Sequence, residues 1–436
     1  MRTLLAVLLI TVTASSQSSI KAPPELFAEG ARIAWIGDSI THACLYTRYL
    51  EDYAWTRYPR RSLEFLNAGV RGDQLSDGLR RLDEEIAAWR PNRALICFGS
   101  NSGSQRRFDP KIVSAYQHDL RKFVERALEL ESAPFLMSSP PYDAESIRLR
   151  KSVAGLAPFS RDYAATLRHL ALVTRDFARK NKLPYIDLQE PLRAHLERLR
   201  FLNAGASLSS DGIHPGPAAS ALIAIEVLKQ IGERGARMSI TIRDSGALIH
   251  GGRELQRKRP IEEPINRRFL IQADVLPWPL PLEAREAVLL DEYYAERNRV
   301  QVRHTTLPHG IWELRVDGVP LISAASATWR QGLDIGLRLE HPDWQQALRL
   351  SAKNGLRNDQ IRSGIRDIQE ARRIAANTPG ISKAVAEQRE QARARMRQLQ
   401  AKLPQLKERI LAELQEIKAL RSPQPHVYEW VRPRSK

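Results

Sequence analysis

The sequence predicts an α/β fold with a parallel sheet over residues 30–235, followed by two regions of different character. Within residues 30–235, short apolar runs alternate with longer amphipathic segments, which is typical of βαβ units with helices on both faces of a sheet. After residue 235 the apolar residues alternate with polar ones, as in half-exposed strands. We therefore expect a β-rich accessory domain over 236–326 and a basic helical region over 327–436.

The chain opens with Met1-Arg2 and an apolar stretch from Thr3 to Thr13. A positive residue, a short apolar stretch and a small residue at its end are typical of a secretory signal peptide, and the stretch is too short to span a bilayer. We expect cleavage after Ala14, which makes residues 1–14 the signal peptide and predicts a secreted or periplasmic protein. No later run reaches transmembrane length.

The first domain contains short apolar runs that are expected to form buried parallel strands, each bounded by turn-forming residues. These runs are residues 33–36, 63–66, 94–98, 135–137 and 185–188. The amphipathic segments between and after them are expected to be helices at 76–89, 110–130, 160–180 and 217–232.

The first predicted strand ends at Gly37-Asp38-Ser39. Ligands of open α/β sheets bind beyond the carboxyl ends of the strands, and a helix beginning after Ser39 would point backbone N–H groups at the same place. Ser39 is therefore a candidate nucleophile. Taken alone, the motif is more typical of a glycine turn with a serine N-cap.

Three further segments strengthen the candidate. They are Asn67-Ala68-Gly69-Val70-Arg71-Gly72, Gly99-Ser100-Asn101-Ser102 and Ser210-Asp211-Gly212-Ile213-His214-Pro215. Together with Gly-Asp-Ser they resemble, in order, the four motif blocks of the SGNH (GDSL-like) hydrolase family, over about half of the chain. The resemblance implies a flavodoxin-like three-layer α/β/α domain and a serine esterase activity.

The resemblance also implies a role for each motif residue. Ser39 would be the nucleophile, and Asp211 and His214 would complete a catalytic triad. The backbone N–H groups of Ser39 and Gly69 and the side-chain amide of Asn101 would form the oxyanion hole. The chemistry agrees, because a serine needs a nearby base, an imidazole needs an acceptor on its other nitrogen, and an oxyanion needs donors already in place.

The third block departs from the family pattern. Ser102 stands where the family usually has aspartate. We expect this change to affect the support of the loop rather than the activity, because the missing carboxylate is not an oxyanion donor.

No metal or organic cofactor is implied. The histidines are scattered and lack zinc-ligand spacing. The two cysteines, Cys44 and Cys97, are expected to be free and buried, although a bond between them is a second interpretation. The net charge of +17 would favour polyanions. The basic residues are widely spread without a nucleic-acid-binding motif, so we expect no nucleic-acid partner and prefer a basic surface suited to anionic polysaccharide or membranes.

The β-rich region contains two predicted hairpins, one around Asp244-Ser245-Gly246 and one around Asp317-Gly318. Its aromatic residues could stack on sugar rings, but core packing is the more common role and we prefer it. These aromatic residues are Trp278, Tyr293, Tyr294 and Trp312.

The last segment is basic, with 19 Lys and Arg against 9 Asp and Glu from Ser351 to Lys436. Apolar residues at alternating spacings of four and three predict a helix with a packing seam. The seam residues are Ala392, Met396, Leu399, Leu403, Leu406 and Ile410. Pro404 predicts a kink or two separate helices. The seam is expected to pack on its own protein, with a homo-oligomer or wall attachment as alternatives.

The sequence thus predicts an exported serine esterase acting on O-acyl groups of carbohydrate, with acetyl as the simplest acyl group. Two alternatives stay open. One is a lipid or aryl esterase, which would prefer longer acyl chains. The other is a non-catalytic glycan-binding protein, which would bind without turnover.

Overall fold

The computed structural model describes residues 25–102, 108–149, 161–234, 238–255, 268–288, 291–377 and 382–433. The predicted signal peptide, residues 1–14, lies outside these ranges. Among the described residues, no helix combines the length and apolar character that a membrane span requires.

A five-stranded parallel sheet forms the first domain, in the order β2-β1-β3-β4-β5. The strands are β1 (Arg32–Gly37), β2 (Glu64–Gly69), β3 (Arg93–Cys97), β4 (Ala133–Met137) and β5 (Tyr185–Ile186). This is the flavodoxin-like strand order, in which the chain changes direction across the sheet between β1 and β3. The predicted fold class is confirmed, and the switch point lies at the strand that ends before Ser39.

Helices cover both faces of this sheet, and successive residues of β1 point to opposite faces. Ile33 and Trp35 pack in one core with residues of α2 (Leu45–Arg57), α7 (Gln189–Leu202) and α8 (Pro217–Gln230). Ala34 and Ile36 pack in the other core, which contains residues of α3 (Leu75–Arg81), α4 (Pro110–Glu129) and α6 (Arg161–Lys180). The sequence predicted a helix after Ser39 but not its division into α1 and α2. Eleven residues of α2 are buried, so it has no distinct polar face to mark its bounds.

The predicted helix at 76–89 is divided in the structure. After α3, residues Leu82–Ile86 form a π-helical turn and Ala87–Trp89 a 3₁₀ turn. The short helices α1 (Ser39–His42) and α5 (Ala144–Leu149) follow β1 and β4.

The β-rich part consists of two sheets, with strand orders β13-β10-β6-β7 and β12-β11-β14-β9-β8. The strands are β6 (Met238–Arg243), β7 (Gly246–His250), β8 (Gly252–Glu254), β9 (Arg268–Ala273), β10 (Val300–His304), β11 (Ile311–Val316), β12 (Val319–Ala325), β13 (Leu333–Asp334) and β14 (Pro425–Val431). Both predicted hairpins are present. The second turns at Asp317 and Gly318, which have φ of 51° and 82°.

The predicted boundary of this region, residues 236–326, needs correction in two respects. First, β14 comes from the far end of the chain and lies in the middle of its sheet, where Tyr428 and Trp430 point into the core. Second, residues 276–285 and 291–297 pack on the first domain. Trp278 and Tyr294 belong to the core of that domain, and the Trp278 indole donates to the backbone oxygen of Tyr49 at 3.0 Å.

The residues between β9 and β10 include the helices α9 (Leu282–Val288) and α10 (Glu292–Arg297). Trp278, Tyr294 and, in the β-rich core, Trp312 are buried. The core-packing interpretation of these three aromatic residues is therefore confirmed, and their rings do not offer a stacking surface to a sugar.

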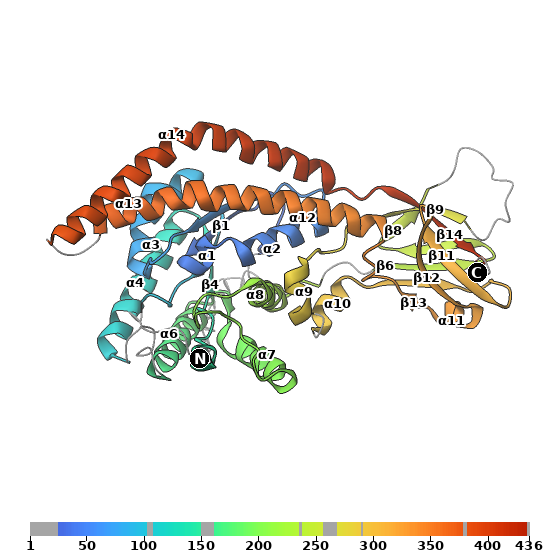
Figure 1. Ribbon diagram of the computed structural model, residues 1–436, viewed down its shortest axis with the longest axis horizontal. Helices are drawn as coiled ribbons and strands as arrows, with labels where there is room; N and C mark the ends of the chain where they lie inside the picture. Colours follow the sequence, from blue (N-terminus) through green and yellow to red (C-terminus); the bar gives the residue numbers. More distant parts are fainter. Residues whose placement is uncertain are drawn as a thin grey trace, which may run out of the picture.

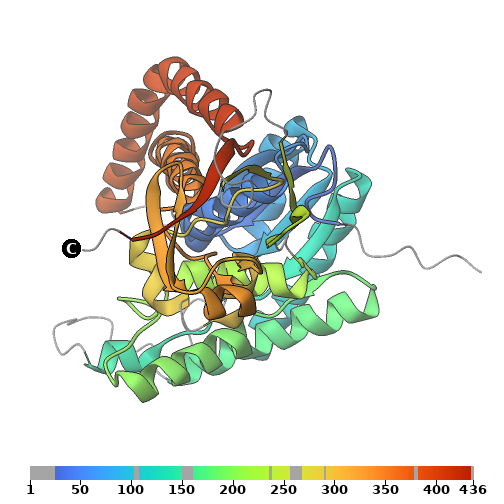
Figure 2. The same cartoon turned by 90° about the vertical axis from the view of Figure 1, so that its right-hand side faces the viewer.

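Three helices connect the two parts of the molecule. They are α12 (Pro342–Gln360), α13 (Asp367–Asn377) and α14 (Lys383–Leu420), with a π-helical turn at Ile361–Arg366 before α13 and the short α11 (Ser326–Gln331) earlier in the chain. Helices α12 and α14 run side by side from the β-rich end across the first domain, and α14 is bent (Figures 1 and 2). The chain then returns to the β-rich end as β14.

Helix α14 is continuous, with Pro404 inside it, so the prediction of two separate helices is wrong and that of a kinked one agrees with the bend in Figure 1. Its seam faces the protein itself. A Cβ on Gly364 would lie 2.0 Å from the Leu406 side chain, so the glycine makes room for this seam residue. The expected packing of the seam on its own protein is confirmed, and a homo-oligomer through these helices stays a prediction.

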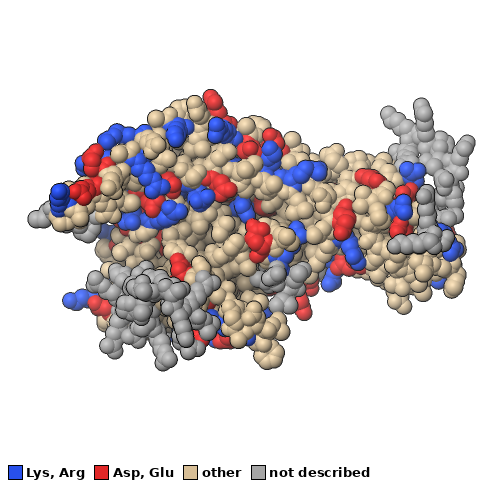
Figure 3. Space-filling model, in the orientation of Figure 1, with Lys and Arg blue, Asp and Glu red and all other residues tan. Residues whose placement is uncertain are grey.

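Lys and Arg side chains lie over α13 and α14 with Asp and Glu between them (Figure 3). Many of these charges form ion pairs within a helix or between neighbouring helices, such as Lys353 with Glu416 and Arg395 with Asp367. On the face that Figure 3 shows, the positive charge is therefore interrupted rather than gathered in one continuous patch.

A buried polar network fastens α12 to α2. Arg357 donates to Glu51 at 3.0 Å, while Ser351 and Asn354 donate to Asp52 at 2.6 and 2.8 Å. Glu51 and Asp52 are at most 1% exposed. Because an unpaired buried charge is costly, these contacts make the C-terminal helices an integral part of the first domain.

We predict that Arg357→Ala lowers the free energy of unfolding by about 3–5 kcal/mol, because it leaves Glu51 buried without its counter-charge. Urea denaturation followed by circular dichroism measures this loss. Arg362→Ala is the matched control, since the Arg362–Asp359 pair is exposed and should contribute less than about 1 kcal/mol. Equal losses in the two variants would contradict the role of the network.

Candidate active site

Ser39 is the first residue of α1 and stands directly beyond the carboxyl end of β1. Asp38 caps this helix, because its Oδ1 accepts a hydrogen bond from the Ile40 N–H at 3.0 Å. Burial raises the pKa of Asp38 to about 7. The turn is also tight at Gly37, where a Cβ would lie 2.2 Å from Thr41 Oγ1. The Gly-Asp-Ser sequence thus lets α1 begin abruptly at the edge of the sheet.

His214 lies between Ser39 and Asp211. Its Nε2 is 2.9 Å from Ser39 Oγ and its Nδ1 is 2.6 Å from Asp211 Oδ2. With the proton on Nδ1 donated to Asp211, Nε2 can accept the proton of the serine hydroxyl. The structure therefore brings together the three residues that the sequence proposed as a triad.

The loop before α8 holds Asp211 in place. Asp211 Oδ1 accepts hydrogen bonds from Ser209 Oγ at 2.8 Å, from the Ile213 N–H at 3.0 Å and from the His214 N–H at 2.8 Å. Gly212 has φ of 81°, which lets the chain turn so that Asp211 and His214 face each other. The aspartate and histidine thus form one local unit that is presented to Ser39.

The electrostatics of this unit suit a general base. Burial acts to raise the pKa of Asp211, but the hydrogen bonds from His214, Ile213 and Ser209 outweigh it and lower that pKa well below its usual value. The hydrogen bond to Asp211 in turn raises the pKa of His214 above 6.5, while partial burial and the charge of Arg71 oppose this rise. His214 is therefore a stronger base than a free imidazole.

The predicted role of Gly69 as an oxyanion donor does not agree with this structure. Its single N–H already donates to Asn67 Oδ1 at 3.0 Å. Gly69 instead allows α1 to approach β2, because a Cβ at this position would lie 2.3 Å from the backbone nitrogen of His42. The sequence could not show that the N–H of this glycine is used internally.

Asn101 reaches the same loop. Its Nδ2 donates to the backbone oxygen of Asp73 at 3.0 Å, and the amide carries a second N–H. Gly72, next to Asp73, has φ of 75°, and within the described part of the chain its N–H has no hydrogen-bond acceptor. Ser102 Oγ is buried and likewise finds no partner among the described residues.

The two cysteines are free and buried, as expected. Burial raises the pKa of Cys44 to about 12 and that of Cys97 well above its usual value. Both groups are therefore held as thiols at neutral pH, and neither competes with Ser39 as a nucleophile.

Two clusters of the described residues have a donor set that could bind a metal ion: His42 with Asp367 and Glu370, and His195 with Glu226 and Asp291. In each, a side-chain cation already lies between the carboxylates. Arg71 is 3.1 Å from Glu370 and 3.7 Å from Asp367, while Lys229 is 3.0 Å from Glu226 and 2.8 Å from Asp291. These cations supply the positive charge that a metal would bring.

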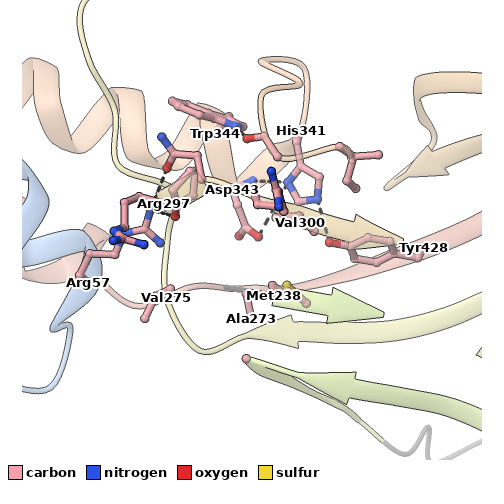
Figure 4. A pocket seen from close by; sticks show the side chains of 16 residues that line it. Arg57, Met238, Ala273, Val275, Arg297, Val300, His341, Asp343, Trp344 and Tyr428 are labelled. Carbon is pink, nitrogen blue, oxygen red and sulfur yellow. Dashed lines mark hydrogen bonds and ion pairs between the residues drawn. The ribbon is translucent and has the colours of Figure 1, made fainter. Parts of the chain in front are cut away.

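A cavity away from Ser39 lies where the first domain meets the β-rich part (Figure 4). Arg57 and Arg297 line one side of it, and His341 and Tyr428, joined by a 2.8 Å hydrogen bond, line the other. Its volume is about 40 Å³. Because one water needs about 10–15 Å³ on this measure, the cavity has room for a few waters and not for a substrate.

A doubly wound α/β domain with Ser, His and Asp at the carboxyl edge of its sheet defines a class of hydrolases. Residues 35–222 match the GDSL-like lipase/acylhydrolase family. The first domain is similar to this family over most of its length, and the chain is a carboxylic ester hydrolase.

Two relatives show the range of the similarity. An acetylxylan esterase from Geobacillus stearothermophilus is 22% identical over 226 residues, which cover 47% of this chain and 94% of that protein. A gut microbial diltiazem-metabolizing enzyme superposes with a TM-score of 0.76 at 20% identity, covering 94% of this chain and 99% of the other. The second similarity shows that the fold extends beyond the hydrolase domain, through the β-rich and helical parts.

The pKa shift of His214 gives a prediction for the pH profile. Because only neutral His214 can accept a proton, kcat/KM should fall as pH drops through a raised pKa, so the midpoint of the acidic limb should lie above 6.5. Asp211→Asn removes the interaction that raises this pKa. It should move the midpoint to lower pH and lower kcat by about 10²–10⁴-fold. A midpoint that does not move in this variant would contradict the assignment.

Proposed function

We propose that this protein is an exported serine esterase that removes O-acyl groups, most simply acetyl groups, from carbohydrate through a Ser39–His214–Asp211 triad. The observation that carries the proposal is the chain of two hydrogen bonds from Ser39 Oγ through His214 to Asp211, of 2.9 and 2.6 Å. This arrangement matches the geometry that nucleophilic serine catalysis requires.

In the proposed mechanism His214 Nε2 takes the proton of Ser39 Oγ while this oxygen attacks the ester carbonyl. The tetrahedral intermediate collapses, the protonated His214 donates its proton to the departing alcohol oxygen, and an acyl-enzyme forms. Water then attacks the acyl carbonyl with His214 as base, and the acid leaves with Ser39 restored. Asp211 orients His214 and stabilises its charged form throughout.

The proposed oxyanion hole is made of the Ser39 N–H, the second N–H of the Asn101 side chain and the Gly72 N–H. Gly72 replaces Gly69 because the Gly69 N–H is engaged by Asn67. The hydrogen bond from Asn101 to Asp73 brings the amide to the same loop as Gly72. Each donor aimed at the developing charge typically contributes about 3–4 kcal/mol to lowering the barrier.

The carbohydrate substrate rests on a distant similarity and on the compartment. The relative from Geobacillus stearothermophilus is named as an acetylxylan esterase. A signal peptide at residues 1–14 would bring the enzyme to extracellular or cell-wall polysaccharide, and the positive net charge would suit an anionic one. Neither the acyl chain nor the sugar follows from the site itself.

Ser39→Ala and wild type should be compared on acetylated oligosaccharides and on aryl esters with short and long acyl chains, following the released acid. We expect turnover by wild type, highest on acetyl esters of sugars, and a loss of about 10⁴-fold or more in kcat for Ser39→Ala. A preference for long acyl chains would favour a lipid esterase instead. Binding of glycans by folded wild type without turnover of any ester would overturn the proposal.

Export gives a separate prediction. When the full chain is expressed in a host with a secretory system, the mature protein should begin at Ser15, because the apolar stretch ends at small residues after which signal peptidases cleave. N-terminal sequencing of the exported protein checks this. Full-length protein retained inside the host, beginning at Met1, would contradict it.

A further inference from the structure

The first turn of α13 touches the helix that carries the nucleophile. Asp367 Oδ1 lies 3.2 Å from His42 Nε2, and His42 is the last residue of α1, which begins at Ser39. Asp367 is more than 300 residues away in sequence, so this contact exists only because the C-terminal helices fold back over the first domain.

His42 has no exposed surface. Within the described residues its ring nitrogens form no hydrogen bond of good geometry, and the Asp367 carboxylate at 3.2 Å is the charged group in contact with Nε2. Burial, and then the charge of Arg71, lower the pKa of His42 to about 4. The imidazole is therefore neutral near pH 7, and it meets the carboxylate through a close polar contact at Nε2.

The opposite side of α1 is fixed by β2. A Cβ on Gly69 would lie 2.3 Å from the backbone nitrogen of His42, so α1 rests directly on the strand. The Asn67 side chain also donates a hydrogen bond to the backbone oxygen of Thr41 at 2.8 Å. The four-residue helix is thus held between β2 and the carboxylate of Asp367.

Asp367 is itself held by two arginines. Arg395 of α14 is 2.8 Å from its Oδ2, and Arg71, in the loop after β2, is 3.7 Å from its Oδ1. Arg71 is also 3.1 Å from Glu370, on the next turn of α13. These pairs fix the position of the carboxylate.

We propose that Asp367 is a positioning residue for ester hydrolysis, holding α1 through His42 so that Ser39 Oγ stays in line with His214. The inference rests on the proposed function of Ser39 and gives the C-terminal helices a role in the active site. Small displacements of a nucleophile lower the rate strongly, because the reacting atoms must meet within about 3–3.5 Å.

The test compares Asp367→Ala with Asp367→Asn in the full chain, on an aryl acetate. Asp367→Ala should lower kcat by about 10–100-fold with KM changed less than about threefold. Asp367→Asn keeps the shape of the side chain and an oxygen in contact with His42, and it should recover most of the rate. Asp359→Ala is the control, because Asp359 is an exposed acid on α12 that pairs only with Arg362 among the ion pairs of the described residues.

A double-variant cycle separates positioning from general stability. With His42→Phe, which removes the ring nitrogens, Asp367→Ala should cost little further activity. Melting curves for every variant show whether the chain is folded at the assay temperature. An equal loss with and without His42→Phe, or a kcat for Asp367→Ala equal to that of wild type, would overturn the inference.

Labelling of Ser39 by a fluorophosphonate gives a readout that does not depend on the ester. The labelling rate of Asp367→Ala should fall by about the same factor as its kcat. Equal labelling rates of wild type and Asp367→Ala would overturn the inference alone. No labelling of folded wild type would overturn the proposed nucleophile and the inference with it, so the two failures are distinguishable.

Discussion

The close approach of α1 to the edge of the parallel sheet is the constraint on which the rest of the site depends. A Cβ at Gly37 would lie 2.2 Å from Thr41 Oγ1, and one at Gly69 would lie 2.3 Å from the backbone nitrogen of His42. Both glycines are therefore needed for a helix to start immediately after β1. This start presents Ser39 at the switch point of the sheet, where His214 can reach it from the loop before α8.

The C-terminal helices are part of the same folded unit as the parallel sheet. The carboxyl groups of Glu51 and Asp52 on α2 are buried and find their hydrogen-bond partners on α12, and Asp367 on α13 meets His42 on α1. The chain then ends as β14 in the middle of a sheet of the β-rich part. A chain cut after residue 235 would lose these partners and leave Glu51 and Asp52 buried without them, so the hydrolase domain is not a simple detachable unit.

The sequence predicted the parts of the molecule in which local pattern and tertiary structure agree. The apolar runs before Ser39, Asn67 and Gly99 became β1, β2 and β3, because a strand buried on both faces is apolar throughout. The fold of the first domain and the loops that meet at the site followed from these runs and their motifs. The hairpin at Asp317-Gly318 followed from turn chemistry alone.

The rest depended on contacts that pattern does not encode. Helix α2 is buried almost all round and has no amphipathic period to detect. The engagement of the Gly69 N–H by Asn67 is a side-chain contact within one motif, and the partnership of His42 with Asp367 joins residues at opposite ends of the chain. The strand β14 does alternate buried and half-buried residues, but it follows a long basic helix and its sheet partners lie far away in sequence.

The measurement that tests the central claim most directly is the identification of the residue modified when the enzyme is inactivated by a fluorophosphonate. Peptide mass mapping should find a single modified residue, Ser39, and the esterase activity should fall in proportion to the fraction modified. Modification at another residue, or activity that persists when Ser39 is fully modified, would contradict the assignment of Ser39 as the nucleophile.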